Sequence, residues 1–228
     1  MWESLKALRV SLATRGLKPT LARAVVFLAD KTFDAVNRTD TFSCVDVRKF
    51  AGDREVKLRA VWYEPTRVLP LRALFKTLRK SYLSPDSVLV DFGCGKGRVL
   101  LVASEYGVKL ARGIEFAEEL CVIARANCET FKARRKMLTA FEVVNCDAAR
   151  YAIKNEENVF FFFNPFDQIM LTRVMDNILF SLKSSDRRVL IVYNNPKHGE
   201  IIEKSGCFRK ISDCAAWTYH FVAYTNQK

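Results

Sequence analysis

The stretch from Asp91 to Arg98 contains the residue types in this sequence that are best suited to hold a ligand. It reads Asp-Phe-Gly-Cys-Gly-Lys-Gly-Arg and follows the apolar run 88–90 directly. Glycine accepts positive φ angles and lets the backbone come close to a ligand. A helix that begins at such a turn presents free N–H groups and a positive dipole end to a carboxylate or phosphate. We therefore predict a strand-to-helix turn that binds a ligand through Gly93, Gly95 and Gly97.

The spacing of these glycines separates two kinds of nucleotide site. A dinucleotide fingerprint, G-x-G-x-x-G, needs a small residue at position 98 so that the helix can pack on the strand. Arg98 stands there, which disfavours a nicotinamide dehydrogenase. Acidic residues follow the next two apolar segments, as Glu115 and Asp147. A carboxylate at the end of a strand can accept hydrogen bonds from both hydroxyls of a ribose, which we predict for Glu115.

Alternating strands and helices must position these residues. We expect parallel strands at 87–91, 109–115, 141–146, 158–163 and 188–193, with helices at 99–103, 117–135, 167–182 and 196–205 between them. The segments 208–213 and 217–224 read as a closing antiparallel pair, and residues 1–80 as helices near 2–15, 19–36 and 70–80. The fold class is therefore α/β: a Rossmann-like, doubly wound, mostly parallel sheet with a C-terminal antiparallel strand pair and an N-terminal helical flank.

Composition and charge exclude several classes of protein. Seven scattered cysteines and two histidines give no zinc pattern, so we expect no metal and reduced thiols in a cytoplasmic protein. The longest apolar runs fall well short of the roughly 20 residues of a transmembrane helix. Of the net charge of +12, residues 1–80 carry +9, from 17 Lys+Arg and 8 Asp+Glu. This basic part favours an acidic macromolecule as partner (protein, nucleic acid or anionic membrane surface) or is a solvated surface without one.

The chain over residues 84–225 resembles the class I S-adenosylmethionine-dependent methyltransferases. The resemblance rests on the G-x-G-x-G loop with Asp91 two residues before it, and on Glu115 and Asp147 after the next strands. It implies S-adenosyl-L-methionine as cofactor, with Asp91 orienting its amino-acid end, Glu115 holding the ribose and Asp147 the adenine amino group. It also implies a division into a basic, mainly helical flank or cap at 1–80 and a cofactor-binding methyltransferase domain at 81–228.

The end of the fourth strand resembles a motif of methyltransferases that act on amino groups. That motif is Asn/Asp-Pro-Pro-aromatic, and here Asn164, Pro165 and Phe166 match it while the second proline is absent. In the family the Asn side chain and the Pro carbonyl accept hydrogen bonds from the target amine, and the ring stacks on the substrate. The resemblance implies catalytic roles for these three residues in methyl transfer to a nitrogen of a protein or other amine.

The chain is also similar to an uncharacterised bacterial group with a G-x-G-K-G-R loop, an N-P-F turn and a later Tyr-x-x-Pro, here Tyr193 to Pro196. Two alternatives stay open: a nucleic-acid methyltransferase, or a nucleic-acid or membrane-surface binding protein with a vestigial cofactor site. Lys96 and Arg98 either reach the cofactor carboxylate or an acidic substrate, or are solvated side chains of the first helical turn.

Overall fold

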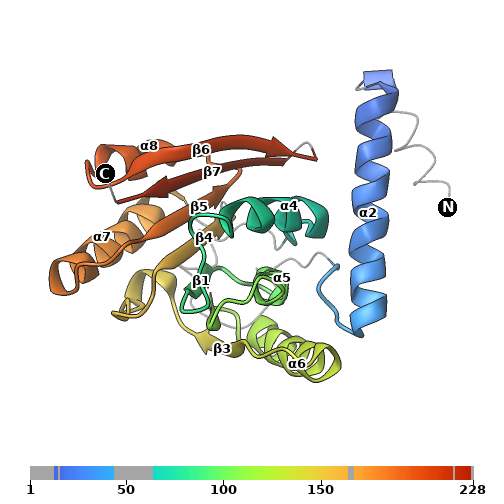
Figure 1. Ribbon diagram of the computed structural model, residues 1–228, viewed down its shortest axis with the longest axis horizontal. Helices are drawn as coiled ribbons and strands as arrows, with labels where there is room; N and C mark the ends of the chain where they lie inside the picture. The colour runs from blue at the N-terminus through green and yellow to red at the C-terminus, as the bar shows by residue number, and fades with distance from the viewer. Residues whose placement is uncertain (1–12, 15, 44–63, 164–166, 218, 227–228) are drawn as a thin grey trace.

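The computed structural model describes residues 13–14, 16–43, 64–163, 167–217 and 219–226. Within them the chain forms a seven-stranded sheet with the order β3-β2-β1-β4-β5-β7-β6 (Figure 1). The strands are β1 (Val88–Phe92), β2 (Leu110–Glu115), β3 (Ala140–Asn145), β4 (Val159–Phe163), β5 (Leu190–Asn194), β6 (Arg209–Ala216) and β7 (Tyr219–Thr225). β1 to β5 run parallel, and β7 is antiparallel to β5 and β6. The predicted mostly parallel sheet with a closing antiparallel pair is confirmed.

Helices cover both faces of this sheet. They are α2 (Leu17–Asn37), α4 (Val68–Leu78), α5 (Arg98–Ser104), α6 (Glu118–Arg135), α7 (Gln168–Ser184) and α8 (Gly199–Lys204), with a short 3-10 helix, η2 (Ala148–Arg150). α4, α5 and α6 supply apolar side chains to a core on one face, and α7 and α8 to a core on the other. The fold is therefore doubly wound, as predicted. The predicted helix near 2–15 lies almost entirely outside the described residues.

The sequence of β4 shows why it occupies the centre of the sheet. Side chains alternate across a strand, so Phe161 enters the core under α4 and α5, while Phe160 and Phe162 enter the core under α7. A strand buried on both faces needs a continuous apolar sequence. The run Val159–Phe163 supplies it, and β4 lies between β1 and β5.

Helix α2 packs beside α4 and α6, on the same side of the sheet as both (Figure 1). The ring of Phe33 stacks on that of Phe131 in α6, with 5.7 Å between centroids. Arg135 donates a hydrogen bond to the Asn37 side-chain oxygen at 2.9 Å. The helical flank that the sequence predicts for this part of the chain is therefore attached to the α/β core through α6.

The start of α8 differs from the sequence-based expectation. We expected Pro196 to open the helix, but α8 begins at Gly199. Asn195 ends the strand region in the left-handed conformation, with φ of 53°. A residue in that conformation redirects the chain, so residues 196–198 complete a turn before helical geometry begins.

Candidate active site

The glycine-rich loop joins β1 to α5 and is held against β2. The amides of Gly93 and Cys94 both donate to the carbonyl of Ile114, at 2.8 and 3.1 Å. Gly93, Gly95 and Gly97 have φ angles of 74°, 53° and 86°, in the region where other residues are strained. The loop thus takes the close-approach conformation that the glycine spacing predicts.

Asp91 lies directly before this loop on the face of the sheet that α4, α5 and α6 cover. Its side chain shares that face with Leu89 because residues alternate along β1. The carboxylate is buried, and among the described residues none donates a hydrogen bond to it. Burial raises the pKa of Asp91 well above its usual value, and the nearby charge of Glu115 raises it further.

Glu115 ends β2 and turns its carboxylate back to the loop. One oxygen accepts a hydrogen bond from the Gly95 amide at 3.0 Å, and the other accepts one from the Ala117 amide at 3.0 Å. Burial raises the pKa of Glu115, and these backbone hydrogen bonds oppose the shift. A carboxylate has about four acceptor positions, so each oxygen keeps room for a further donor.

The remaining predicted site residues follow β3 and β4. Asp147 comes after β3 and caps η2, since its side chain accepts a hydrogen bond from the Ala149 amide at 2.9 Å. Asn164, Pro165 and Phe166 lie outside the described residues. Asp91, Glu115 and Asp147 all follow or end neighbouring parallel strands, so the topology brings these three to one edge of the sheet.

Lys96 and Arg98 are buried side chains, which corrects the reading of them as solvated residues of the first helical turn. Both are 2% exposed. Lys96 pairs with Asp40 at 3.0 Å and also bonds Ser43. The two residues are therefore not solvated: they bind the segment that follows α2.

Arg98 makes the more extensive contact with the N-terminal part of the chain. Its Nε donates to the Thr41 hydroxyl at 2.7 Å. Its terminal nitrogens lie 3.3 Å from Asp30 Oδ1 and 3.5 Å from Asp34 Oδ2, at ion-pair distance although not in hydrogen-bond geometry. Asp34 in turn accepts hydrogen bonds from Thr39 and Thr41. We call this group, Asp30, Asp34, Thr41 and Arg98, the flank clamp.

Two features of the site were not expected from the sequence. A Cβ added to Gly113 would lie 2.4 Å from Cys94 Sγ, so β2 needs glycine where the loop packs on it. Asn194, the last residue of β5, is 1% exposed, and among the described residues neither its Oδ1 nor its Nδ2 has a hydrogen-bond partner. It lies within the Tyr-x-x-Pro segment, Tyr193 to Pro196, but that motif predicts no role for it.

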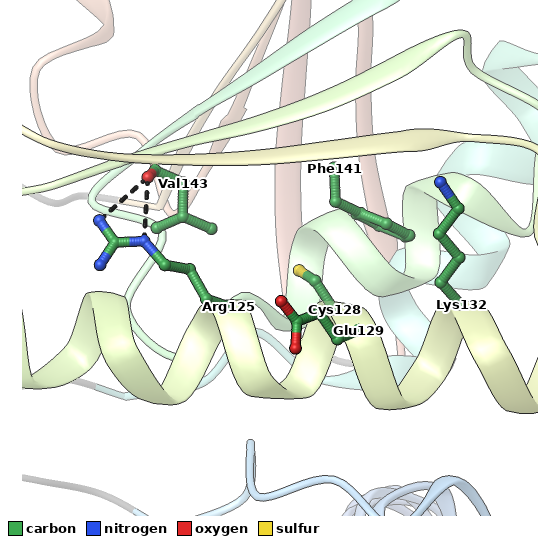
Figure 2. Close-up of a pocket in the computed structure, with 6 residues that line it drawn as sticks. All are labelled: Arg125, Cys128, Glu129, Lys132, Phe141 and Val143. Carbon is green, nitrogen blue, oxygen red and sulfur yellow. Dashed lines mark hydrogen bonds between the residues drawn. The ribbon is translucent and has the colours of Figure 1, made fainter.

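A surface groove lies apart from these residues, between α6 and the edge strand β3. It is lined by Arg125, Cys128, Glu129, Lys132, Phe141 and Val143. Figure 2 shows the Arg125 guanidinium turned to the Val143 carbonyl, to which it donates at 3.3 and 3.2 Å. None of the predicted site residues lines this groove, so it is not the site that the glycine loop marks.

Among the residues that the structure describes, no cluster of three or more His, Cys, Asp or Glu side chains is arranged to hold a metal ion. No helix there combines the length and the apolar character that crossing a membrane requires.

The family of the chain follows from its sequence over the loop and the strands around it. Residues 69–199, more than half of the chain, match the family model described as histone methylation protein DOT1. The chain belongs to this family. A curated relative from Saccharolobus islandicus, a protein-lysine N-methyltransferase, is 35% identical to this DOT1-family protein over 68 residues. That match covers 29% of the chain and 40% of the relative, so the chain spans well under half of the relative's length.

Solved structures show that this DOT1-family protein has the methyltransferase fold. An S-adenosylmethionine-dependent methyltransferase from Aquifex aeolicus aligns with a TM-score of 0.54 and 14% identity, over 70% of this chain and 92% of that one. A tRNA (uracil-54, C5)-methyltransferase from Pyrococcus abyssi, in complex with S-adenosyl-L-homocysteine, aligns at 0.50 and 15%, over 72% and 41%. The chain thus belongs to a family of methylation proteins and has the fold of S-adenosylmethionine-dependent methyltransferases.

Proposed function

We propose that this protein transfers a methyl group from S-adenosylmethionine to an amine nitrogen of a protein, with the lysine ε-amine as the acceptor. The observation that carries the proposal is the pair of buried carboxylates, Asp91 and Glu115, on either side of the glycine loop in a DOT1-family chain. The curated lysine methyltransferase that matches part of the chain supports the choice of lysine.

The residues of the loop fit the cofactor by their chemistry. Asp91 is a buried carboxylate to which no described residue donates, so it suits the ammonium group of the cofactor's amino-acid end. Glu115 keeps acceptor capacity for the two ribose hydroxyls beside its bonds to Gly95 and Ala117. Asp147 would hold the adenine amino group, and Gly93, Gly95 and Gly97 would let the backbone approach.

The cofactor supplies an activated methyl group on a sulfonium, and the chain's residues orient the acceptor. With the cofactor bound, an N–C bond to the amine would form as the C–S bond of the sulfonium breaks and S-adenosylhomocysteine is released, and the proton of the amine would go to water. Asn164 and Pro165 would accept hydrogen bonds from the amine and aim its lone pair, while Phe166 would pack against the substrate. Positioning of this kind, rather than acid–base chemistry, is the protein's main contribution. The similarity to the bacterial group rests on the glycine loop from Asp91 to Arg98 and on the turn from Asn164 to Phe166.

The test is methyl transfer from isotopically labelled S-adenosylmethionine to two acceptors offered separately, core histones and total tRNA. We expect label in histone, recovered as Nε-methyl-lysine after hydrolysis, and its loss in Asn164→Ala. The matched control is Asn195→Asp, an exposed neighbour of the site whose left-handed backbone aspartate tolerates. Label in tRNA alone would overturn the lysine assignment, and label in neither, without cofactor binding, would overturn the proposal.

A nucleic-acid methyltransferase is the second candidate, and the charge of the chain is the observation that favours it. The net charge is +12, and +9 of it lies in residues 1–80. We infer that an acidic macromolecule is the partner of that basic part. We also infer that the chain divides at residue 80 into the basic flank and the cofactor-binding domain. The tRNA arm of the experiment decides between this candidate and a basic surface that only brings the enzyme to its protein substrate.

A further inference from the structure

Asn194 is a buried amide whose hydrogen-bonding groups are both unused. It ends β5, where its backbone pairs with Phe163 of β4 and Phe221 of β7. The side chain is 1% exposed, and no residue that the structure describes forms a hydrogen bond with Oδ1 or Nδ2. An amide buried in this way costs free energy, because water would have satisfied both groups in the unfolded chain. A ligand that donates to Oδ1 would remove part of that cost.

The alternation of side chains places Asn194 on the same face of the sheet as Asp91. Leu190 and Val192 enter the core under α4 and α5, whereas Ile191 and Tyr193 enter the opposite core. Asn194 therefore faces the α4–α5 side, as Leu89 and Asp91 do in β1. Figure 1 shows β4 between these two strands.

The strand register gives the separation between the two side chains. Asp91 pairs with Phe161, and Phe161 pairs with Val192, so Asn194 lies two residues further along. It is about 10 Å to the side of Asp91, two strand spacings, and about 7 Å further toward the carboxyl ends of the strands. This puts the amide at the carboxyl end of β5, on the face of the sheet that also carries Asp91 and beyond Asp91 along the strand direction.

The surroundings of Asn194 favour a neutral amine. Its partners across the sheet are the rings of Phe163 and Phe221, and Phe221 is 1% exposed. An apolar environment disfavours a charged ammonium relative to the free amine, which is the nucleophilic form. In these surroundings, Oδ1 of Asn194 can accept a hydrogen bond from the amine N–H.

From this geometry we propose that Asn194 is an acceptor-binding residue, whose Oδ1 receives a hydrogen bond from the primary amine that is to be methylated. The proposal rests on the proposed function and adds a second amide to the one expected from Asn164. It requires that Asn194 contribute to binding of an amine beside the cofactor, and not to binding of the cofactor itself.

The experiment compares two ligands by calorimetry, S-adenosylhomocysteine and sinefungin. Sinefungin carries a primary amine where S-adenosylmethionine carries its methyl sulfonium. For Asn194→Leu we expect affinity for sinefungin to fall about tenfold, the size of one hydrogen bond, with affinity for S-adenosylhomocysteine unchanged. Asn194→Asp keeps an acceptor oxygen and should retain sinefungin. Asn195→Asp, an exposed residue next along the chain, is the control.

The melting temperature of the ligand-free variants completes the test. Asn194→Leu should melt at or above the wild-type temperature, because leucine has a similar size and no polar group to leave unpaired. If both ligands bind Asn194→Leu as they bind the wild type, or if both weaken equally, the inference is wrong while the proposed function stands. If the wild type binds neither ligand, the proposed function fails and the inference fails with it.

Discussion

Asp91 is a charged residue in a place that is costly for charge, and the pH dependence of stability follows from it. The pKa of Asp91 is raised well above its ordinary value by burial and by Glu115. The folded state therefore binds a proton more tightly than the unfolded state. It follows that the free energy of unfolding falls as pH rises from the ordinary carboxylate range through the raised pKa.

Asp91→Asn should remove this cost and the cofactor site together. We expect the ligand-free variant to melt above the wild type, by a margin that is larger near pH 8 than near pH 4, where the wild-type carboxyl is also neutral. Its melting temperature should not respond to S-adenosylmethionine. Thermal melts across pH with and without cofactor measure both effects. If the difference in melting temperature became smaller as pH rises, the buried charge of Asp91 would not be the cause of the lost stability.

Gly113 shows a different constraint at the level of one residue. Gly113→Ala would place a Cβ 2.4 Å from Cys94 Sγ, 2.8 Å from Cys94 Cβ and 3.0 Å from Leu100. Overpacking of this kind costs about 1–3 kcal/mol, measurable by urea unfolding. Cys94→Ala should recover part of the loss in a double variant, since it removes the sulfur but keeps the Cβ at 2.8 Å. Additive losses would show that the clash lies elsewhere.

At this scale, sequence reasoning finds the groups whose chemistry is visible in one short segment. The loop glycines, Asp91 and Glu115 lie within 25 residues of one another, and their types alone point to a nucleotide. Gly113 and Asn194 matter because of what strands distant in sequence place beside them. No local pattern contains that information.

Among the elements, α2 and the glycine loop are joined by the flank clamp. Arg98→Ala would leave Asp30 and Asp34 without this buried cation. Removing one partner of a buried ion pair costs about 3–5 kcal/mol. We expect such a loss in urea unfolding, with earlier cleavage in α2 in limited proteolysis. The control is Arg134→Ala, which removes an exposed hydrogen bond from Arg134 of α6 to the Val36 carbonyl of α2. We expect it to cost about 1 kcal/mol or less. If both variants lost the same free energy of unfolding, the flank clamp would contribute no more than an exposed hydrogen bond.

The elements themselves were largely predictable, because apolar runs and turn residues alternate regularly from residue 84 onward. The strand expected at 158–163 corresponds to β4, whose five apolar residues fit a strand buried on both faces. The start of α8 was missed because the left-handed Asn195 changes the chain direction before the helix begins. The clamp was missed since Arg98 in isolation reads as a surface residue. Its burial depends on α2, which lies more than 60 positions earlier.

For the whole molecule, the net charge of +12 favours electrostatic binding to acidic macromolecules. Lys18 and Arg23 are exposed on α2. We expect the protein to bind duplex DNA, with a logarithmic affinity that falls linearly with the logarithm of salt. Lys18→Glu with Arg23→Glu should weaken binding and flatten that slope. The matched control is Arg173→Glu with Lys183→Glu, exposed on α7 over the other face of the sheet. Equal effects of the two pairs in fluorescence anisotropy would place the binding surface elsewhere.

The flank clamp also has a thermodynamic consequence. Arg98 is at once the first residue after the cofactor loop and the buried partner of α2. If the docking of α2 and the conformation of the loop belong to one equilibrium, a macromolecule that binds α2 changes the affinity of the loop for S-adenosylmethionine. By reciprocity the cofactor then changes the affinity for that macromolecule by the same factor. The affinity of the enzyme for its methyl donor would thus differ between the free protein and the protein with a partner bound to its basic flank.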